Sequence, residues 1–162
     1  MKDVRMSSKK RNKKIILLVL IVSFVVLIDQ LTKAYILNFR DSFFYGQKVF
    51  NGLNIVYVEN KGISFGFLAD LNISFYLGII SFFIGFYIIF LIEKSNQFQE
   101  LLSLSMIFGG AVGNGFDRVT NHYVIDFIDF YYNNYHWPAF NFADAFITLG
   151  AVIYFWRIIV KN

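Results

Sequence analysis

The sequence contains no cysteine and a single proline among its 162 residues. Without cysteine the chain has neither disulfide nor thiol chemistry, and cysteine usage gives no information about the redox compartment. Charged residues are also scarce, at 16% of the chain, whereas hydrophobic residues make up 57% and aromatic residues 20%. This balance excludes an ordinary soluble domain.

Apolar runs without charge are the main feature that is present, and crossing a bilayer takes about 20 apolar residues. The pattern predicts four membrane-spanning helices, at about 15–37, 72–92, 101–118 and 140–160. We therefore expect an all-α membrane protein in which residues 1–162 form one domain. A small external β-sheet or loop subdomain is expected between the first two helices.

The first apolar run follows a basic segment, as in a cleavable signal peptide, but no small-x-small cleavage site follows it. We expect this run to be retained as a helix. Seven of the 15 Lys and Arg residues precede residue 15, which places the N-terminus in the cytoplasm. The C-terminus is then also cytoplasmic, and segments 38–71 and 119–139 are external loops. Because topology explains the basic charge, no nucleic-acid partner is expected.

Four aspartates lie in or beside the apolar runs: Asp29, Asp117, Asp126 and Asp144. A charged side chain at the bilayer centre costs roughly 2.5–3.5 kcal/mol on insertion scales, so such residues are functional candidates. The predicted topology brings all four to the outer boundary of the membrane. Polar residues there can also cap helix ends, and Asp29 with Lys33 can form a simple helix pair. The gathering of all four at one boundary favours a site.

The external segment 38–71 contains a hairpin signal, because Asn51-Gly52 lies between apolar stretches. Residues 53–58 are rich in the β-branched and aromatic types that strands prefer. We expect a small sheet on the membrane surface, which could hold an extended peptide by strand addition.

Glycines are concentrated in the outer half of the third apolar run. Gly109 and Gly113 form a small-xxx-small pair, which lets helix backbones approach closely. Close packing there would fix Asn114, Asp117 and Arg118 near the site. Arg118 is expected to pair with Asp117, with contact to a lipid ester as the alternative.

Five blocks of sequence, in this order, resemble the lipoprotein signal peptidases, the type II signal peptidases of bacteria. They read DQLTK at 29–33, NKGISFG at 60–66, GAVGNGFDR at 110–118, VIDF at 124–127 and FNFAD at 140–144. The departures from the family pattern are small: Ser64, Ile125 and Ala145 replace the residue that is common there. None of these removes a group that the chemistry needs.

The resemblance implies an aspartyl endopeptidase of the bacterial cytoplasmic membrane. Such an enzyme removes the signal peptide from a prolipoprotein just before a cysteine that carries diacylglycerol. Its catalytic pair would be Asp126 and Asp144. Its partners would be prolipoproteins and membrane lipids, and it would work as a monomer without metal or cofactor. Substrate-binding or supporting roles fall to Asp29, Lys33, Asn60, Gly66, Asn114, Arg118 and Asn141.

Three alternatives stay open at this stage. His122 and Asp126 are four residues apart with His136 nearby, so a metallopeptidase is conceivable. A small ion-coupled transporter would also place acids in the membrane, but near its midplane. A scaffold protein would explain the helices but not the five ordered blocks.

Asp129 is expected to face water as a loop residue.

Overall fold

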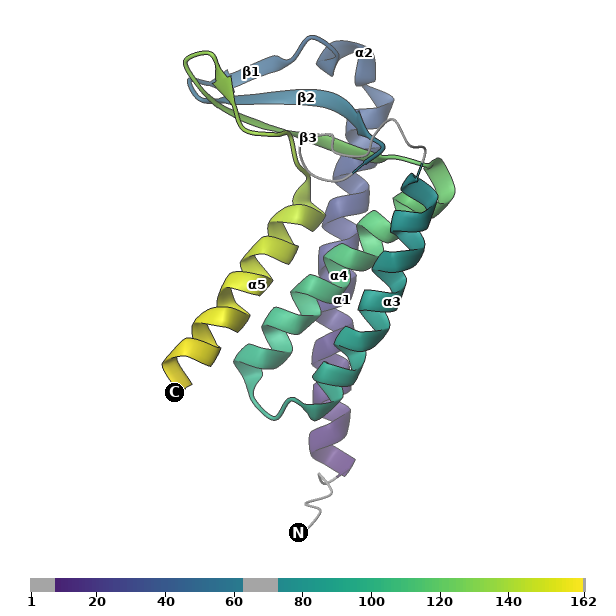
Figure 1. Cartoon of the computed structure of the whole chain (residues 1–162), viewed down its shortest axis with the longest axis vertical. Coiled ribbons are helices and arrows are strands. Elements are labelled where there is room, and N and C mark those ends of the chain that lie inside the picture. Colours follow the sequence, from purple (N-terminus) through teal and green to yellow (C-terminus); the bar gives the residue numbers. More distant parts are fainter. Residues whose placement is uncertain (1–7, 63–72, 162) are drawn as a thin grey trace.

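The computed structural model describes residues 8–62 and 73–161. Within these residues four long helices form a bundle with a small sheet at one end (Figure 1). The start of the first helix and the end of the last lie at the other end of the bundle. The helices are α1 (Ser8–Asn38), α3 (Ser74–Lys94), α4 (Phe98–Asn121) and α5 (Phe142–Lys161).

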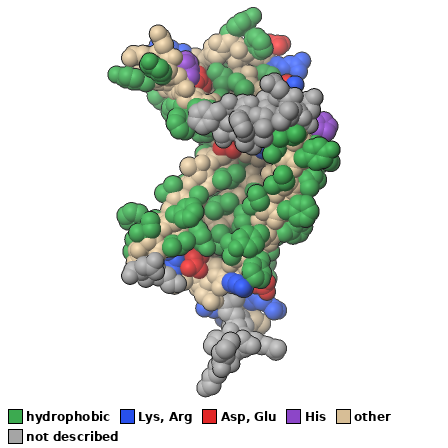
Figure 2. Space-filling model, viewed as in Figure 1, with side chains coloured by type: hydrophobic (Ala, Val, Ile, Leu, Met, Phe, Trp, Pro, Cys, Tyr) green, Lys and Arg blue, Asp and Glu red, His purple; other side chains and the backbone are tan. Residues whose placement is uncertain are grey.

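Three helices of the described chain are long and apolar enough to cross a membrane: α1, α3 and residues Phe142–Val160 of α5. Figure 2 shows hydrophobic side chains along the helices and charged ones gathered near the two ends. The fourth predicted span, 101–118, lies within α4, which is not among these three. The reason is the composition of α4, which contains several glycine and serine residues as well as acidic ones. These residues are mostly buried, because α4 packs against each of the other three helices.

The sheet is antiparallel, with strand order β1-β2-β3-β4. Strands β1 (Gln47–Phe50) and β2 (Leu53–Asn60) follow the short helix α2 (Arg40–Phe43). The predicted hairpin is confirmed, because Asn51-Gly52 joins these strands and Gly52 has a φ of 102°, in the region that glycine occupies without strain.

The sheet extends beyond the segment in which it was predicted. Segment 119–139, interpreted as a loop, contains β3 (Val124–Tyr132) and β4 (Tyr135–His136). The sheet is therefore shared between two segments of the chain rather than confined to the one between the first two helices. The physical reason is that β3 is rich in β-branched and aromatic residues and pairs along β2, which is distant in sequence.

A β-bulge in β3 changes which side chains face the site. The backbone N–H groups of Phe127 and Ile128 both donate to the Phe140 carbonyl, at 3.0 and 2.9 Å, so β3 bulges opposite Phe140. The pairing with β2 shifts at the same place, with the extra residue on β2 between Ile55 and Val58. A bulge breaks the strict alternation of side chains. Ile128 therefore packs on the apolar side together with Phe127, while Asp126 and Asp129 both line a cavity on the other side.

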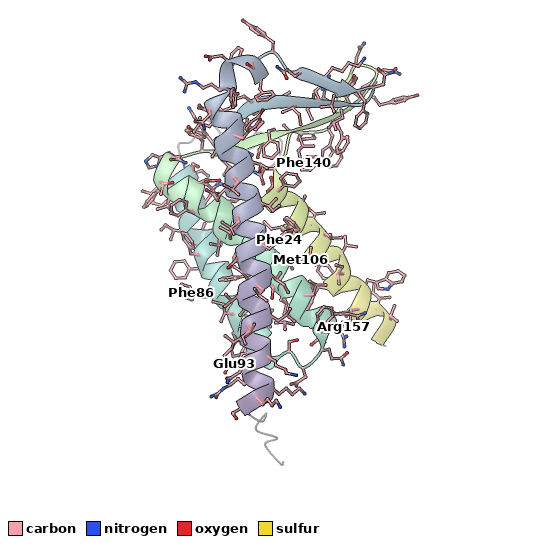
Figure 3. The ribbon with its side chains drawn as sticks, turned by 180° about the vertical axis from the view of Figure 1, so that it is seen from behind. Phe24, Phe86, Glu93, Met106, Phe140 and Arg157 are labelled. Atoms are coloured by element: carbon pink, nitrogen blue, oxygen red, sulfur yellow. The ribbon has the colours of Figure 1, made fainter. Side chains whose placement is uncertain are left out.

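The apolar side of β3 fixes the sheet to the bundle. Ile125 and Phe127 are buried against Ile36 of α1 and Phe43 of α2. Figure 3 shows Phe140 where the sheet meets the start of α5, with Glu93 and Arg157 near the far end. The sheet thus sits directly over the beginning of α5, where the polar residues gather.

Close helix packing at the glycines of α4 is confirmed. A Cβ at Gly109 would lie 2.9 Å from the Val25 Cβ, and one at Gly113 would lie 2.8 Å from Oδ2 of Asp29. Because neither glycine has a side chain, α1 approaches α4 closely enough to bring Asp29 against it.

Candidate active site

Asp126 lies on β3 and is almost fully buried. Its Oδ1 accepts a hydrogen bond of 2.6 Å from Nδ2 of Asn141, and its Oδ2 accepts one of 2.9 Å from Nδ2 of Asn60. Burial, and next the negative charge of Asp144, raise the pKa of Asp126 from 3.8 to about 7, against the opposing effect of these hydrogen bonds. This carboxyl is therefore able to gain or lose a proton near neutral pH.

Asp144 lies in the first turn of α5 and takes part in capping that helix. Its backbone N–H donates to Oδ1 of Asn141 at 2.9 Å, while its Oδ2 accepts from the Asn141 N–H at 3.4 Å. This reciprocal arrangement is a capping box, which satisfies two backbone donors at the helix start. Oδ1 of Asp29 accepts from the Ala143 N–H at 2.9 Å. The fold thus holds Asp144 by local helix geometry and by α1.

Two asparagines connect the two aspartates. Nδ2 of Asn114 donates to Oδ1 of Asp144 at 2.8 Å. Oδ1 of Asn114 accepts from Nδ2 of Asn141 at 3.2 Å, and the same Asn141 amide donates to Asp126. Asp126 and Asp144 therefore belong to one hydrogen-bond network of uncharged amides, which are less costly to bury than charges.

Lys33 supports this network from α1 and is only 3% exposed. Its Nζ donates to Oδ2 of Asp29 at 2.7 Å, to Oδ2 of Asp117 at 2.6 Å and to Oδ1 of Asn114 at 2.8 Å. All three ammonium donors are therefore satisfied. The predicted Asp29–Lys33 helix pair is confirmed, but it is part of a buried cluster rather than a surface pair.

Arg118 does not pair with Asp117 as expected, since Asp117 binds Lys33 and the amide of Gln30 instead. Nη2 of Arg118 donates to the Gly62 carbonyl at 3.0 Å. Its Nε is buried and has no hydrogen-bond partner in the part of the chain that the structure describes.

A cavity of about 580 Å³, which we call the helix pocket, opens beside the two aspartates. Asn60, Arg118, Asp126 and Asp144 form its polar end. Its other lining residues come from residues 137–140 and from α5, and most are apolar; those on α5 include Ile147, Leu149 and Val152. One pocket thus presents two carboxylates next to an apolar surface, a combination typical of a binding site.

The structure brings together eight of the nine predicted site residues: Asp29, Lys33, Asn60, Asn114, Arg118, Asp126, Asn141 and Asp144. Gly66 lies outside the described residues. Sequence reasoning missed Gln30, whose Nε2 donates to Asp117 at 3.1 Å and to Asp29 at 3.2 Å. The sequence offered one signal for a role of Gln30, namely its position next to Asp29.

Asp129 is a further correction, because it lies on β3 and is 6% exposed rather than facing water. Both of its carboxylate oxygens contact Nδ1 of His136, and Oδ2 also accepts from Nδ2 of Asn54. Across residues 8–62 and 73–161, no three His, Asp or Glu side chains are grouped as they would be to hold a metal ion.

Comparison with solved structures defines the class of this protein. The chain is similar to a bacterial membrane enzyme solved by the in meso method at 2.3 Å resolution, with a TM-score of 0.78 and 31% identity over 89% of this chain and 88% of that one. A second bacterial membrane enzyme, solved at 1.9 Å, gives a TM-score of 0.74 and 32% identity over 90% and 94%. With its apolar helices, the fold is that of a bacterial membrane enzyme.

The family model described as signal peptidase (SPase) II matches residues 21–160. The lipoprotein signal peptidase of Cupriavidus necator is 44% identical over 135 residues, covering 80% of this chain and 75% of that protein. The enzyme of the same name from Thermodesulfovibrio yellowstonii is 39% identical over 139 residues, covering 85% and 90%. The chain therefore belongs to the signal peptidase II family and is a peptidase.

Gly113→Ala tests the contact between α4 and Asp29. The added Cβ would lie 2.8 Å from Oδ2 of Asp29, so the carboxylate must move away from the N–H at the start of α5. We expect the peptidase kcat to fall roughly 10- to 100-fold, since displacements of about 1 Å have such effects. Gly85→Ala is the matched control, because its Cβ meets only the Phe108 ring. Unchanged kcat in Gly113→Ala would contradict this role of the contact.

Proposed function

We propose that the protein is an aspartyl endopeptidase that removes the signal peptide from diacylglyceryl-modified prolipoproteins, cleaving just before the lipidated cysteine. The observation that carries the proposal is the pair Asp126 and Asp144, which face one pocket and share one amide network. Membership of the signal peptidase II family supports the same reaction class. The names of the relatives support prolipoproteins as substrates.

The proposed mechanism uses one proton shared by the pair. Two neighbouring buried carboxyl groups cannot both ionise readily, which agrees with the raised pKa of Asp126. The ionised member takes a proton from water, and the resulting hydroxide attacks the scissile carbonyl carbon. The protonated member donates its proton to the carbonyl oxygen. The member that took the proton from water then gives it to the leaving amine as the C–N bond breaks, and a hydroxyl proton of the intermediate returns to the other carboxylate as the new carboxyl group forms. The apparent pKa values belong to the pair rather than to either residue.

The remaining polar groups position the pair and the substrate. Asn60 and Asn141 hold the carboxylate of Asp126 through one hydrogen bond to each oxygen. Asn114 holds Asp144, and Lys33 fixes Asn114 in turn. The Arg118 side chain lines the polar end of the helix pocket, where its guanidinium group could donate to a substrate carbonyl.

The apolar part of the helix pocket suits a lipid-modified substrate. It runs along α5, one of the three helices apolar enough to lie in a membrane, so an acyl chain or the signal-peptide helix could occupy it without leaving the bilayer. We propose direct contact with membrane lipids here, and an enzyme that works as a single-domain monomer.

We further propose that α4 is the fourth span and that the sheet lies on the outer surface of the bacterial cytoplasmic membrane. Support comes from the bundle, in which α4 lies among the three apolar helices, and from the start of α1 and the end of α5, which lie away from the sheet (Figure 1). The basic residues before residue 15 then place both termini in the cytoplasm. This orientation puts the two aspartates at the outer edge of the membrane, where the cleavage point of a lipoprotein precursor lies.

The first test is cleavage of a diacylglyceryl-modified prolipoprotein by the purified protein in detergent or lipid. The unmodified precursor is run beside it, and one sample contains a chelator. Cleavage that requires the lipid and survives chelation supports an aspartyl lipoprotein peptidase. Absence of cleavage by folded protein would contradict the proposal, and loss on chelation would favour a metallopeptidase.

The pH dependence of cleavage follows from the raised pKa of Asp126. Because the mechanism needs one protonated carboxyl, we expect kcat/KM to fall as pH rises above about 7. Asn60→Ala removes a donor that stabilises the ionised form of Asp126, so the alkaline limb should move to higher pH. Profiles from pH 5 to 9 would check both points. If the alkaline limb of the Asn60→Ala profile lies at the same pH as in wild type, Asp126 is not the titrating group.

A further inference from the structure

A second cavity, of about 500 Å³, lies on the sheet and adjoins the helix pocket; we call it the sheet pocket. Both cavities include Asn60 and Asp126 in their lining, and residues 137–139 also line both. The two cavities therefore meet at a proposed catalytic carboxylate and extend from it in different directions. The other residues that line the sheet pocket are Val56, Val58, Asp129 and His136.

The bulge in β3 allows two carboxylates of the same strand to line this pocket. Without it, Asp126 and Asp129, three residues apart, would point to opposite faces of the strand. Both instead line the sheet pocket. Among the described residues, the lining includes these two carboxylates and no Lys or Arg.

Asp129 is held firmly in this position. Nδ1 of His136 lies 2.9 and 3.0 Å from its two oxygens, and Nδ2 of Asn54 donates to Oδ2 at 2.9 Å. The segment that follows His136 is held by the Trp137 N–H, which donates to the Phe130 carbonyl at 2.7 Å. The pocket wall is therefore fixed along β3, and the mechanism proposed above makes no use of Asp129 or His136.

We propose that the sheet pocket binds the residues that follow the lipidated cysteine and that Asp129 sets a preference there for cationic over acidic side chains. The inference rests on the proposed function, in which the apolar helix pocket holds the membrane-embedded part of the substrate. The released chain must then leave the cleavage point along the sheet. Asp129 is three residues from Asp126, about 10 Å along a strand, which matches an extended substrate within three residues of the cysteine.

The test uses synthetic diacylglyceryl-cysteine peptides with Lys, Ser or Asp at each of the first three positions after the cysteine. We expect wild-type protein to show a higher kcat/KM for Lys than for Asp at one of these positions. Asp129→Asn should reduce that Lys/Asp ratio about fivefold, since charge pairs at partly open sites contribute up to about 1 kcal/mol. Glu59→Gln is the matched control, because it removes an exposed carboxylate from the same sheet outside the pocket.

A second variant keeps the test valid if Asp129→Asn fails to fold. Val56→Lys places a cation in the sheet pocket while both Asp129 and His136 are kept, and it should also lower the Lys/Asp ratio. A purely structural role for Asp129 would reduce cleavage of all peptides equally, and unchanged ratios in both variants would overturn the subsite. The proposed function is judged separately, by cleavage of the serine peptide by wild-type protein. No cleavage of that peptide would overturn the function, and the subsite with it.

Discussion

Replacing Asp126 by asparagine is expected to lower kcat/KM for a lipidated prolipoprotein by about 10²- to 10⁴-fold, the usual contribution of a general acid or base. Asparagine keeps the size of the side chain but can neither share a proton with Asp144 nor accept one from water. Two donors, on Asn60 and Asn141, point at this side chain, so one of them loses its acceptor. That loss costs about 1–3 kcal/mol. The measurement is turnover of the lipidated substrate by purified variant.

Folding must be followed beside turnover, because a lost acceptor also affects stability. Thermal unfolding in detergent and membrane insertion serve this purpose. Asp41→Asn is a suitable control, since Asp41 is fully exposed on α2, away from the pocket. If Asp126→Asn folds, inserts and still cleaves at a near-normal rate, the aspartyl mechanism is wrong.

Lys33→Met is expected to have the second-largest effect, a loss of about 3–5 kcal/mol of stability together with loss of cleavage. The substitution leaves the carboxylates of Asp29 and Asp117 buried without their cation, and uncompensated buried charge costs that much. Asn114 loses a donor as well, so the support for Asp144 weakens. Denaturant unfolding in mixed micelles measures the stability, and Lys48→Met is the exposed control.

The origin of the Lys33 effect can be isolated by removing the charges together. Asp29→Asn and Asp117→Asn in the Lys33→Met background eliminate the unpaired carboxylates, so much of the lost stability should return. Cleavage should not return, because Asn114 would still lack the hydrogen bond from Lys33 that positions it. If Lys33→Met alone is as stable as wild type, the buried cluster is not a structural support of the site.

Local signals in the sequence predicted much of the fold. The apolar runs located the helices, and Asn51-Gly52 located the hairpin, because helix length and turn chemistry are properties of short segments. The strand character of 124–132 was equally local but was overlooked, since the segment was interpreted as a loop. The packing of α4 against all three other long helices was not predicted, because it depends on those helices and not on α4 alone.

The candidate site was predictable in its membership but not in its connections. The Asn141-x-x-Asp144 spacing is a capping box that could have been identified from sequence. Two of the three partners of Lys33, Asn114 and Asp117, could not be identified in this way, because they come from another helix. The place of Asp129 depended on a bulge, and one irregular residue reverses the side on which every later side chain falls.

The pairing of Asp29 with Lys33 within α1 bears on how the protein is made. During synthesis α1 reaches the membrane before α4 and α5 exist, so Asn114, Asp117 and the Ala143 N–H are not yet present. A carboxylate and an ammonium one turn apart, 2.7 Å from each other, allow the nascent helix to enter lipid with its two costly charges already neutralised. Asp144 arrives only with the last helix. Under the proposed mechanism, a nascent chain therefore carries the Asp29–Lys33 pair before it has both catalytic carboxyl groups, and it becomes active only after α5 has been made.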